Sequence, residues 1–348
     1  MSKVRSIGLL LIGLCVVLLI VHFVGVGEVV DVVRMSGKPY LFVVALGIQI
    51  GTIWLWAVRW KTLLDLFSPV SVKTSFKGIL IGVFFNNITP VARAGGEPFR
   101  AYYVEKKEGV DFENAFATVA IDRILDSLPF LVIIMASLLY FVLLLNVSIH
   151  MIIILVFALV FNVILLSLVL YFSLNLRAAK KLAFSILRFA ARFSKKLLTY
   201  ETKVESAIEQ YHQAIMTFSS HKKQLFISLS ISFVFWFLVI VRNYLVVLAL
   251  GYDVRFMAIV VIQMVGTLVG ILPILPGGLG SIEGVMIFLY FSFSFPIPVA
   301  ASASLLDRLI SFWITTGVGA IVVFKERCYL TRKETDREGP LPEKEEIS

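Results

Sequence analysis

Two glutamates, Glu97 and Glu283, each follow a glycine-rich stretch inside an otherwise apolar region of the chain. Pro90 stands before Glu97 at the same spacing as Pro276 before Glu283. An isolated carboxylate in an apolar interior costs several kcal/mol or takes up a proton, so it is seldom passive. We expect the two glutamates to act as proton-coupled carboxylates or as gate residues paired with arginine. The alternative is a salt bridge that holds a broken helix to its neighbour.

An Asp-Arg pair follows each glutamate, first as Asp122-Arg123 and later as Asp307-Arg308. A guanidinium group can bind phosphate through two parallel hydrogen bonds, which suits a phospholipid or polyprenyl-phosphate headgroup. We expect each pair to lie within about one turn of the start of its helix, at opposite membrane faces. The other interpretation is an ion pair at a helix end that locks the interface between two repeats.

Further polar residues surround the two glycine-rich breaks. Arg100, with Arg93, is expected to gather an anionic headgroup at the inner mouth, and the bias of basic residues toward the cytoplasm explains both equally well. Arg242 lies near the end of its helix and is expected to reach outward to the membrane surface. Asn86 and Asn87 are expected to satisfy backbone groups that the first break frees. The residues expected to shape the breaks are Asn86, Asn87, Pro90, Gly95, Gly96, Pro276, Gly277, Gly278 and Gly280.

The elements that position these residues are predicted to be membrane helices. The chain is 59% hydrophobic and 16% charged, whereas a soluble domain is about a quarter charged. Apolar runs near the roughly 20 residues that a membrane helix needs cover 7–24, 40–58, 127–145, 149–174, 225–250 and 303–324. The two cysteines, Cys15 and Cys328, suggest neither a disulfide framework nor a metal site. The composition therefore excludes a soluble enzyme or nucleic-acid-binding domain.

Basic residues near the span ends set the orientation of the chain. They place the N-terminus, the loop 175–224 and the tail 325–348 in the cytoplasm. Counting the spans from that loop shows that residues 73–113 must begin and end on the cytoplasmic side. Residues 256–301 must begin and end on the external side. Residues 78–89 form an apolar stretch only about 18 Å long as a helix, which is too short to cross. Each of the two regions is therefore predicted to be a re-entrant hairpin.

The two broken regions match one another along the chain. The spacing from Glu97 to Asp122 equals that from Glu283 to Asp307 to within a single position. Arg59 and Arg242 also precede the prolines of their own breaks at similar distances in the sequence. These matches, at a nearly constant offset along the chain, predict a duplication. An odd number of spans separates the hairpins, so we predict an all-α polytopic membrane protein built from inverted repeats, at about 40–145 and 225–324, within one domain 1–324.

The cytoplasmic segment 175–224 joins the two predicted repeats. Between 177 and 196 it holds seven basic residues and no acidic one, with Leu182, Ile186, Phe189 and Phe193 at helical spacing. A helix that is apolar on one face and basic on the other is typical of one lying on an anionic leaflet. An ordinary positive-inside loop without a lipid role explains the charge equally well.

The motif Thr89-Pro90…Arg93…Gly96-Glu97…Arg100, together with Pro276-Gly277-Gly278-Leu279-Gly280…Glu283, resembles a known family. It is similar to the transmembrane domain of lysylphosphatidylglycerol synthases, the flippase domain of the multiple peptide resistance factors, over about residues 5–325. The resemblance implies movement of aminoacylated phosphatidylglycerol between leaflets, and related archaeal proteins are linked to dolichol-phosphate sugars. The short tail 325–348 leaves no room for the soluble aminoacyl-transferase domain, so synthase activity is not expected.

We therefore expect a flippase in the cytoplasmic membrane that moves a phosphate-bearing lipid, without enzymatic activity, metal, cofactor or nucleic-acid partner. One alternative is a membrane enzyme on a prenyl-phosphate substrate, with Mg²⁺ shared by Asp122 and Asp126 on one helix face. Another is a non-catalytic partner of a separate lipid synthase or glycosyltransferase. The expected transport residues are Arg93, Glu97, Arg100, Asp122, Arg123, Asp126, Glu283, Asp307 and Arg308, with Arg59 and Arg242 as repeat-matched arginines.

Overall fold

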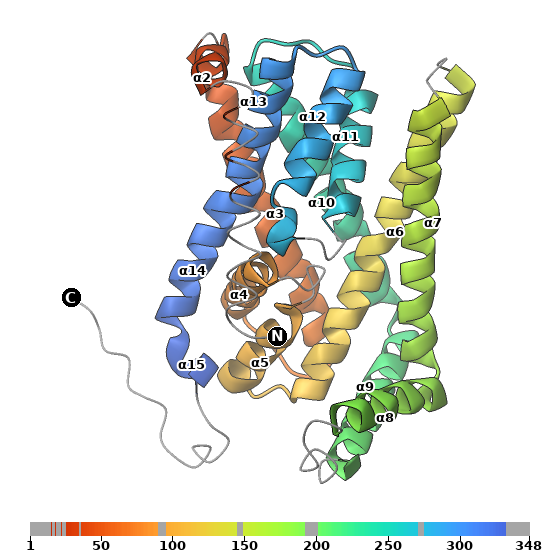
Figure 1. Ribbon diagram of the computed structural model, residues 1–348. Coiled ribbons are helices and arrows are strands. Elements are labelled where there is room, and N and C mark those ends of the chain that lie inside the picture. Colours follow the sequence, from red (N-terminus) through yellow and green to blue (C-terminus); the bar gives the residue numbers. More distant parts are fainter. Residues whose placement is uncertain are drawn as a thin grey trace, which may run out of the picture.

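The computed structural model describes residues 26–34, 36–89, 95–144, 149–191, 201–270 and 275–331, together with 15, 18 and 22. Every element in this part of the chain is helical, which confirms the predicted all-α class for it (Figure 1). Most of the predicted span 7–24 lies outside the described residues. Pro90, Arg93 and the tail from 332 lie wholly outside them.

Among the described residues, four helical runs are long and apolar enough to cross a membrane. They are α3 (Tyr40–Leu64), the Leu155–Leu174 part of α7 (Ile149–Leu174), α10 (Lys222–Ala249), and the run Ile297–Lys325 formed by α13 (Ile297–Arg308), η3 (Leu309–Ile314) and α14 (Thr315–Lys325). The helix α6 (Phe112–Leu144) has 33 residues and carries no charge after Asp126. The length and composition of these helices agree with the predicted polytopic membrane protein.

Two pairs of short helices lie between the long ones. The first pair is α4 (Val72–Ile88) and α5 (Glu97–Glu108), and the second is α11 (Phe256–Val269) and α12 (Ser281–Ser292), with the 3-10 turn η2 (Pro276–Gly278) between them. Their lengths of 17, 12, 14 and 12 residues fall short of a full span. In Figure 1 the first pair lies in the lower half of the molecule and the second in the upper half.

Local chemistry starts and stops these short helices. The Ser71 hydroxyl accepts a hydrogen bond from the Thr74 amide at 3.1 Å and so caps α4. Gly109, with a φ of 75°, ends α5 in the left-handed conformation that favours glycine. At the start of α12 the Gly280 amide donates to Glu283 Oε2 at 2.7 Å. η2 packs against α4, so the two hairpins meet in the interior.

Glycine permits the close approach of the hairpins to their neighbours. A Cβ atom on Gly96 would lie 1.9 Å from the carbonyl oxygen of Gly82, which belongs to α4. A Cβ atom on Gly277 would lie 2.2 Å from the Phe312 ring, and Gly277 also has a φ of 59°. Any larger residue at either position would push the backbone apart.

The helices of the two halves begin at matching positions. The chain from the start of α3 to the start of α10 is nearly as long as the chain from α4 to α11, from α5 to α12, or from α6 to α13. These starts are paired as Tyr40 with Lys222, Val72 with Phe256, Glu97 with Ser281, and Phe112 with Ile297. Each hairpin also has a hydrophobic core of its own. One is built around Trp60, Ile79 and Tyr103, and the other around Met264, Met286 and Tyr290.

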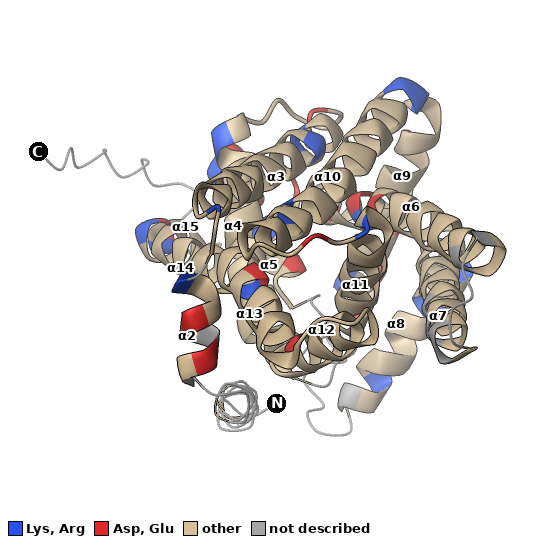
Figure 2. Cartoon of the chain, turned by 90° about the horizontal axis from the view of Figure 1, so that it is seen from above, with Lys and Arg blue, Asp and Glu red and all other residues tan. Residues whose placement is uncertain are grey.

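The structure corrects the expected depth of the two Asp-Arg pairs. α6 begins at Phe112 and α13 at Ile297, so Asp122 and Asp307 each lie ten residues into a helix. Ten residues correspond to about 15 Å of helix. The predicted spans begin too late because the polar Glu113 and Asn114 open α6, and a weakly apolar stretch from Ile297 to Ser302 opens α13. The pairs therefore lie well inside their helices, and Asp122 and Asp307 are buried in the bundle. Figure 2 accordingly shows charged segments among the interior helices as well as at the outer ends.

α7 stands at one side of the bundle in both views. At its lower end in Figure 1 the chain turns into α8 (Leu176–Ala191), which runs across the base of α7, and then into α9 (Glu201–Ser220). α9 packs on α6 through Ala214, Ile215 and Phe218. The remaining described elements are α2 (Val26–Arg34) and the short α15 (Arg327–Thr331).

Candidate functional site

A cavity of about 530 Å³ is bordered by both hairpins and by helices from both halves of the chain. α7 contributes an apolar wall with Leu165, Leu166 and Val169. The other helices contribute both apolar and polar side chains, so the cavity joins apolar and polar surface. The charged residues that line it are Glu97, Arg123, Asp126, Arg242, Asp307 and Arg308.

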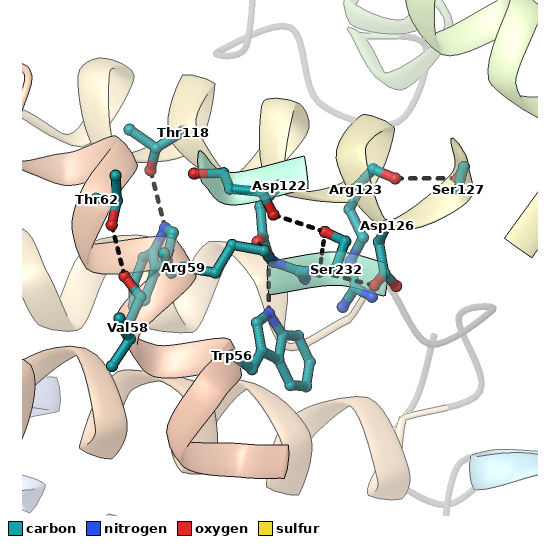
Figure 3. A network of polar contacts seen from close by, with 12 residues as sticks. Trp56, Val58, Arg59, Thr62, Thr118, Asp122, Arg123, Asp126, Ser127 and Ser232 are labelled. Atoms are coloured by element: carbon teal, nitrogen blue, oxygen red, sulfur yellow. Dashed lines mark hydrogen bonds and ion pairs between the residues drawn. The ribbon is translucent and has the colours of Figure 1, made fainter. Parts of the chain in front are cut away.

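Arg59 on α3 is the centre of an ion-pair network in the first half (Figure 3). Its Nε donates to Asp122 Oδ1 at 2.7 Å, and its Nη1 donates to Asp126 Oδ1 at 2.9 Å. Nη1 also donates to the Ser232 hydroxyl on α10 at 2.7 Å. The Trp56 indole donates to the second oxygen of Asp122 at 2.8 Å. The carboxylates of Asp122 and Asp126 therefore enclose a guanidinium group.

Arg242 on α10 makes the matching contact in the second half. Its Nε and Nη2 donate to the two oxygens of Asp307 at 3.0 and 3.2 Å, a bidentate pair. Its Nη1 donates to Gln49 Oε1 on α3 at 2.5 Å, and Gln49 in turn donates to Thr315 at 3.1 Å. Arg242 is buried, so the expectation that it reaches outward to the surface is wrong. A buried aspartate one helix away offers it a stronger partner than water.

Each of the two arginines also donates a hydrogen bond to a residue of the other half. Arg59 bonds to Ser232, and Arg242 bonds to Gln49. Gln49 and Ser232 are as far apart in the sequence as Arg59 and Arg242. Each arginine is thus held by an aspartate of its own half and by a polar residue at the matched position of the other half.

Glu97 at the start of α5 gathers three donors. Arg100 Nε donates to it at 2.6 Å, Asn86 Nδ2 donates at 3.1 Å, and Arg123 forms a close ion pair with it. The Asn86 amide oxygen also accepts a hydrogen bond from the Gly96 backbone at 2.6 Å, the kind of contact expected for it. Asn87 instead donates to the Thr316 hydroxyl at 2.7 Å, so it satisfies a side chain rather than backbone.

Glu283 and Arg308 form the matching pair in the second half. Arg308 Nε donates to Glu283 Oε1 at 2.8 Å, and its Nη2 donates to the Gly277 carbonyl in η2 at 2.9 Å. The other oxygen of Glu283 accepts from the Gly280 amide. Arg308 therefore ties the second hairpin to α13, and both side chains are buried.

Arg100 and Arg123 have different surroundings. Arg100 lies between the rings of Trp56 and Trp60, at 5.5 and 4.8 Å, and bridges Glu97 to Asp122. It is buried, which corrects the expectation that it marks an open mouth. The Arg123 side chain is 36% exposed, whereas Arg59, Arg100, Arg242 and Arg308 are at most 6% exposed. Arg123 is thus the site arginine with room for a ligand.

The site is balanced in charge within the described residues. Five arginines face five carboxylates, and each is ion-paired within the site. Pairing of this kind is what allows charged side chains to persist at membrane depth. Because Asp122 and Asp126 are already bonded to Arg59, they do not fit the shared Mg²⁺ site of the prenyl-phosphate enzyme hypothesis.

Sequence reasoning missed Gln49, Ser232 and Asn162. Gln49 and Ser232 could have been found because they share the repeat offset, although neither carries a charge. Asn162 is an isolated polar residue in the apolar α7; it is buried in the cavity wall, and its side-chain oxygen accepts no hydrogen bond from the described residues. An uncharged residue in a long apolar run offers little signal.

Known proteins share this sequence along most of its length. A profile described as the lysylphosphatidylglycerol synthase TM region matches residues 6–319. A UPF0104 membrane protein of Methanothermobacter thermautotrophicus is 32% identical over 90% of this chain and 94% of its own. Another, from Pyrococcus horikoshii, is 30% identical over 92% of this chain and 96% of its own. No solved structure shows a significant match. The chain therefore belongs to the lysylphosphatidylglycerol synthase transmembrane-region family, which confirms the resemblance found in its motifs.

Proposed function

We propose that the protein moves a phosphate-bearing lipid between the leaflets of the cytoplasmic membrane, with the headgroup passing through the cavity. The observation that supports this proposal is Arg123, whose guanidinium group is partly exposed in the cavity, whereas the other site arginines are buried in their ion pairs. Phosphate oxygens are strong partners for guanidinium. An aminoacylated phospholipid and a polyprenyl-phosphate carrier both meet this requirement.

Displacement of Arg123 by a headgroup leaves Glu97 well partnered. Glu97 keeps its bonds to Arg100 and Asn86 when Arg123 turns to a phosphate. Release of Arg308 would leave Glu283 with only the Gly280 amide and would free the second hairpin. Breaking a buried pair in this way costs about 3–5 kcal/mol. The described conformation is therefore suited to bind the headgroup in the first half.

We infer that the two halves are inverted repeats with both termini in the cytoplasm. The matched helix starts and the exchanged contacts of Arg59 and Arg242 support a common origin of the halves. In an inverted pair the second hairpin would take the role of the first in a conformation open to the other side. The acyl or prenyl chains would remain in the bilayer along the apolar wall of α7, whose outer residues are exposed.

Vesicles that contain the protein test the proposal. Arg123→Gln should slow translocation of a fluorescent phosphate lipid about tenfold, because one charge-assisted hydrogen bond is lost. Leaflet-specific quenching measures the rate, with a labelled lipid lacking phosphate for comparison. Arg255→Gln, an exposed arginine at the start of α11, is the matched control and should not alter the rate. Equal rates in empty and protein-containing vesicles for every phosphate lipid would instead favour the non-catalytic partner of a synthase or glycosyltransferase.

A further inference from the structure

α8 presents three different faces along its length. Lys180, Phe184 and Leu187 share one face and none of them is exposed. Leu182 and Ile186, one turn apart, lie on a second face and are 42% and 59% exposed. Arg177, Lys181 and Arg188 are exposed on a third face. The helix contains no acidic residue.

The first face packs against α9. Lys180 Nζ bonds to Glu205 at 2.8 Å and to Glu209 at 2.5 Å, and both glutamates lie on α9. These bonds raise the pKa of Lys180, because the charged form is the one that pairs. α9 in turn packs on α6. The orientation of α8 about its own axis is therefore set, and the apolar and basic faces point away from the protein.

The exposed apolar residues of α8 follow those of α7 closely along the chain. Only Asn175 separates the two helices, and its side chain caps α8 by accepting from the Ala178 amide at 3.0 Å. At this corner an open groove of about 830 Å³ joins apolar residues of α7, such as Leu170 and Leu174, to Arg177 and His212. Apolar chains and a charged headgroup would find suitable partners there, side by side.

We propose that α8 is a membrane-surface anchor that lies in the headgroup region of an anionic leaflet. Leu182 and Ile186 insert among the acyl chains, and Arg177, Lys181 and Arg188 pair with lipid phosphates. An amphipathic helix at this depth gains both from apolar burial and from attraction to anionic lipids. Because Lys180 is already neutralised by α9, the exposed cations are the ones that select the lipid.

Spin labelling of the full-length protein in nanodiscs tests the anchor independently of lipid movement. A nitroxide at Ile186→Cys is compared with one at Ser185→Cys, the exposed polar neighbour, after Cys15 and Cys328 are replaced by serine. In discs of phosphatidylcholine with phosphatidylglycerol, the label at 186 should collide mainly with oxygen and the label at 185 mainly with a water-soluble nickel chelate. Lys181→Gln with Arg188→Gln should lower the ratio of inserted to released helix about fivefold for each charge removed.

The same measurements can overturn the proposal. A label at 186 that is as open to nickel as the label at 185 would show that the apolar face is not in the membrane. Equal insertion in discs of phosphatidylcholine alone, or no effect of the two glutamine substitutions, would show that the cations do not select anionic lipid. Dipolar broadening between labels at 186 would show that a second copy of the chain covers the face.

Discussion

Arg242 and Asp307 form a buried bidentate pair beside the cavity, and neither has a second charged partner among the described residues. We expect Arg242→Leu or Asp307→Leu alone to lower the free energy of unfolding by about 3–5 kcal/mol, because each leaves a buried charge unpaired. The double substitution should recover most of that loss. Unfolding of the detergent-solubilised protein measures all three variants. Additive losses in the double variant would contradict a direct pairing.

The sequence predicted most of the charged residues of the site but not all of their partners. Carboxylates and arginines in apolar surroundings are informative because they are costly to bury. Which arginine meets which carboxylate depends on how helices far apart in the chain approach one another. Asn162 and Gln49 were identified only from the structure. An uncharged amide costs less free energy to bury than a charge, so its presence in an apolar run does not by itself indicate a site.

At the scale of the elements, Gly96 marks the closest approach of α5 to α4. Gly96→Ala would place a methyl group against the backbone oxygen of Gly82, which cannot move aside. We expect a loss of about 1–3 kcal/mol in the free energy of unfolding, the usual cost of overpacking. Gly47→Ala on the exposed face of α3 is the matched control, because its Cβ would meet nothing within 4 Å. An unchanged free energy of unfolding in Gly96→Ala would mean that α5 and α4 can move apart at little cost.

The turns that follow the hairpins test the inferred inversion of the halves. Asp111 lies between α5 and α6, and Ser292 lies at the end of α12; both are exposed. Single cysteines at these positions, in a background without Cys15 and Cys328, should react with an impermeant reagent from opposite sides of the membrane. Asp111→Cys should label from the cytoplasm and Ser292→Cys from outside. Reaction of both from one side would rule out inverted repeats.

The existence of the elements was easier to predict than their ends. The apolar runs identified α3, α7, α10 and the last span, and the short broken regions identified the hairpins. The starts of α6 and α13 were missed by more than a turn. The first turn of α6 carries Glu113 and Asn114, and the first turns of α13 are only weakly apolar, with Pro298 and Ser302 among small residues. Hydropathy reports the lipid-facing part of a helix, so it cannot see such a turn.

At the scale of the whole molecule, Glu326 fastens the C-terminal end of the last span to the first hairpin. It pairs with Lys77 on α4, accepts from the Tyr103 hydroxyl on α5 at 3.0 Å, and lies 3.7 Å from Lys107. Burial by itself raises the pKa of Glu326, but Lys77, Tyr103 and Lys107 outweigh it and hold the pKa below its usual value. The carboxylate therefore stabilises the folded state when it is ionised.

Removal of the Glu326 charge should make stability less dependent on pH. A carboxylate whose pKa is lower in the folded protein than in the unfolded chain stabilises the fold at a pH above its unfolded-state pKa. That stabilisation is lost as the pH falls through the folded-state pKa. Glu326→Gln should thus lower the thermal midpoint at neutral pH, and the difference from the native protein should shrink below pH 4.5, the ordinary value for glutamate. Glu113→Gln on α6 is the control. A difference that is constant with pH would contradict the ion-pair role.

Each half interrupts its last helix beyond the Asp-Arg pair, at Pro129 in α6 and in η3 directly after Arg308. Pro129 lies within α6 seven residues after Asp122, and the π-helical η3 ends at Ile314, seven residues after Asp307. Proline removes one backbone hydrogen bond, and a π-helical turn spaces them differently, so a helix bends most easily at such places. Both helices therefore carry a joint within about two turns of the charged residues. Under the proposed lipid transport, the part of each span beyond this joint would tilt while the ion pairs stay closed. A passage would then widen for lipid chains before a headgroup displaces an ion-pair partner.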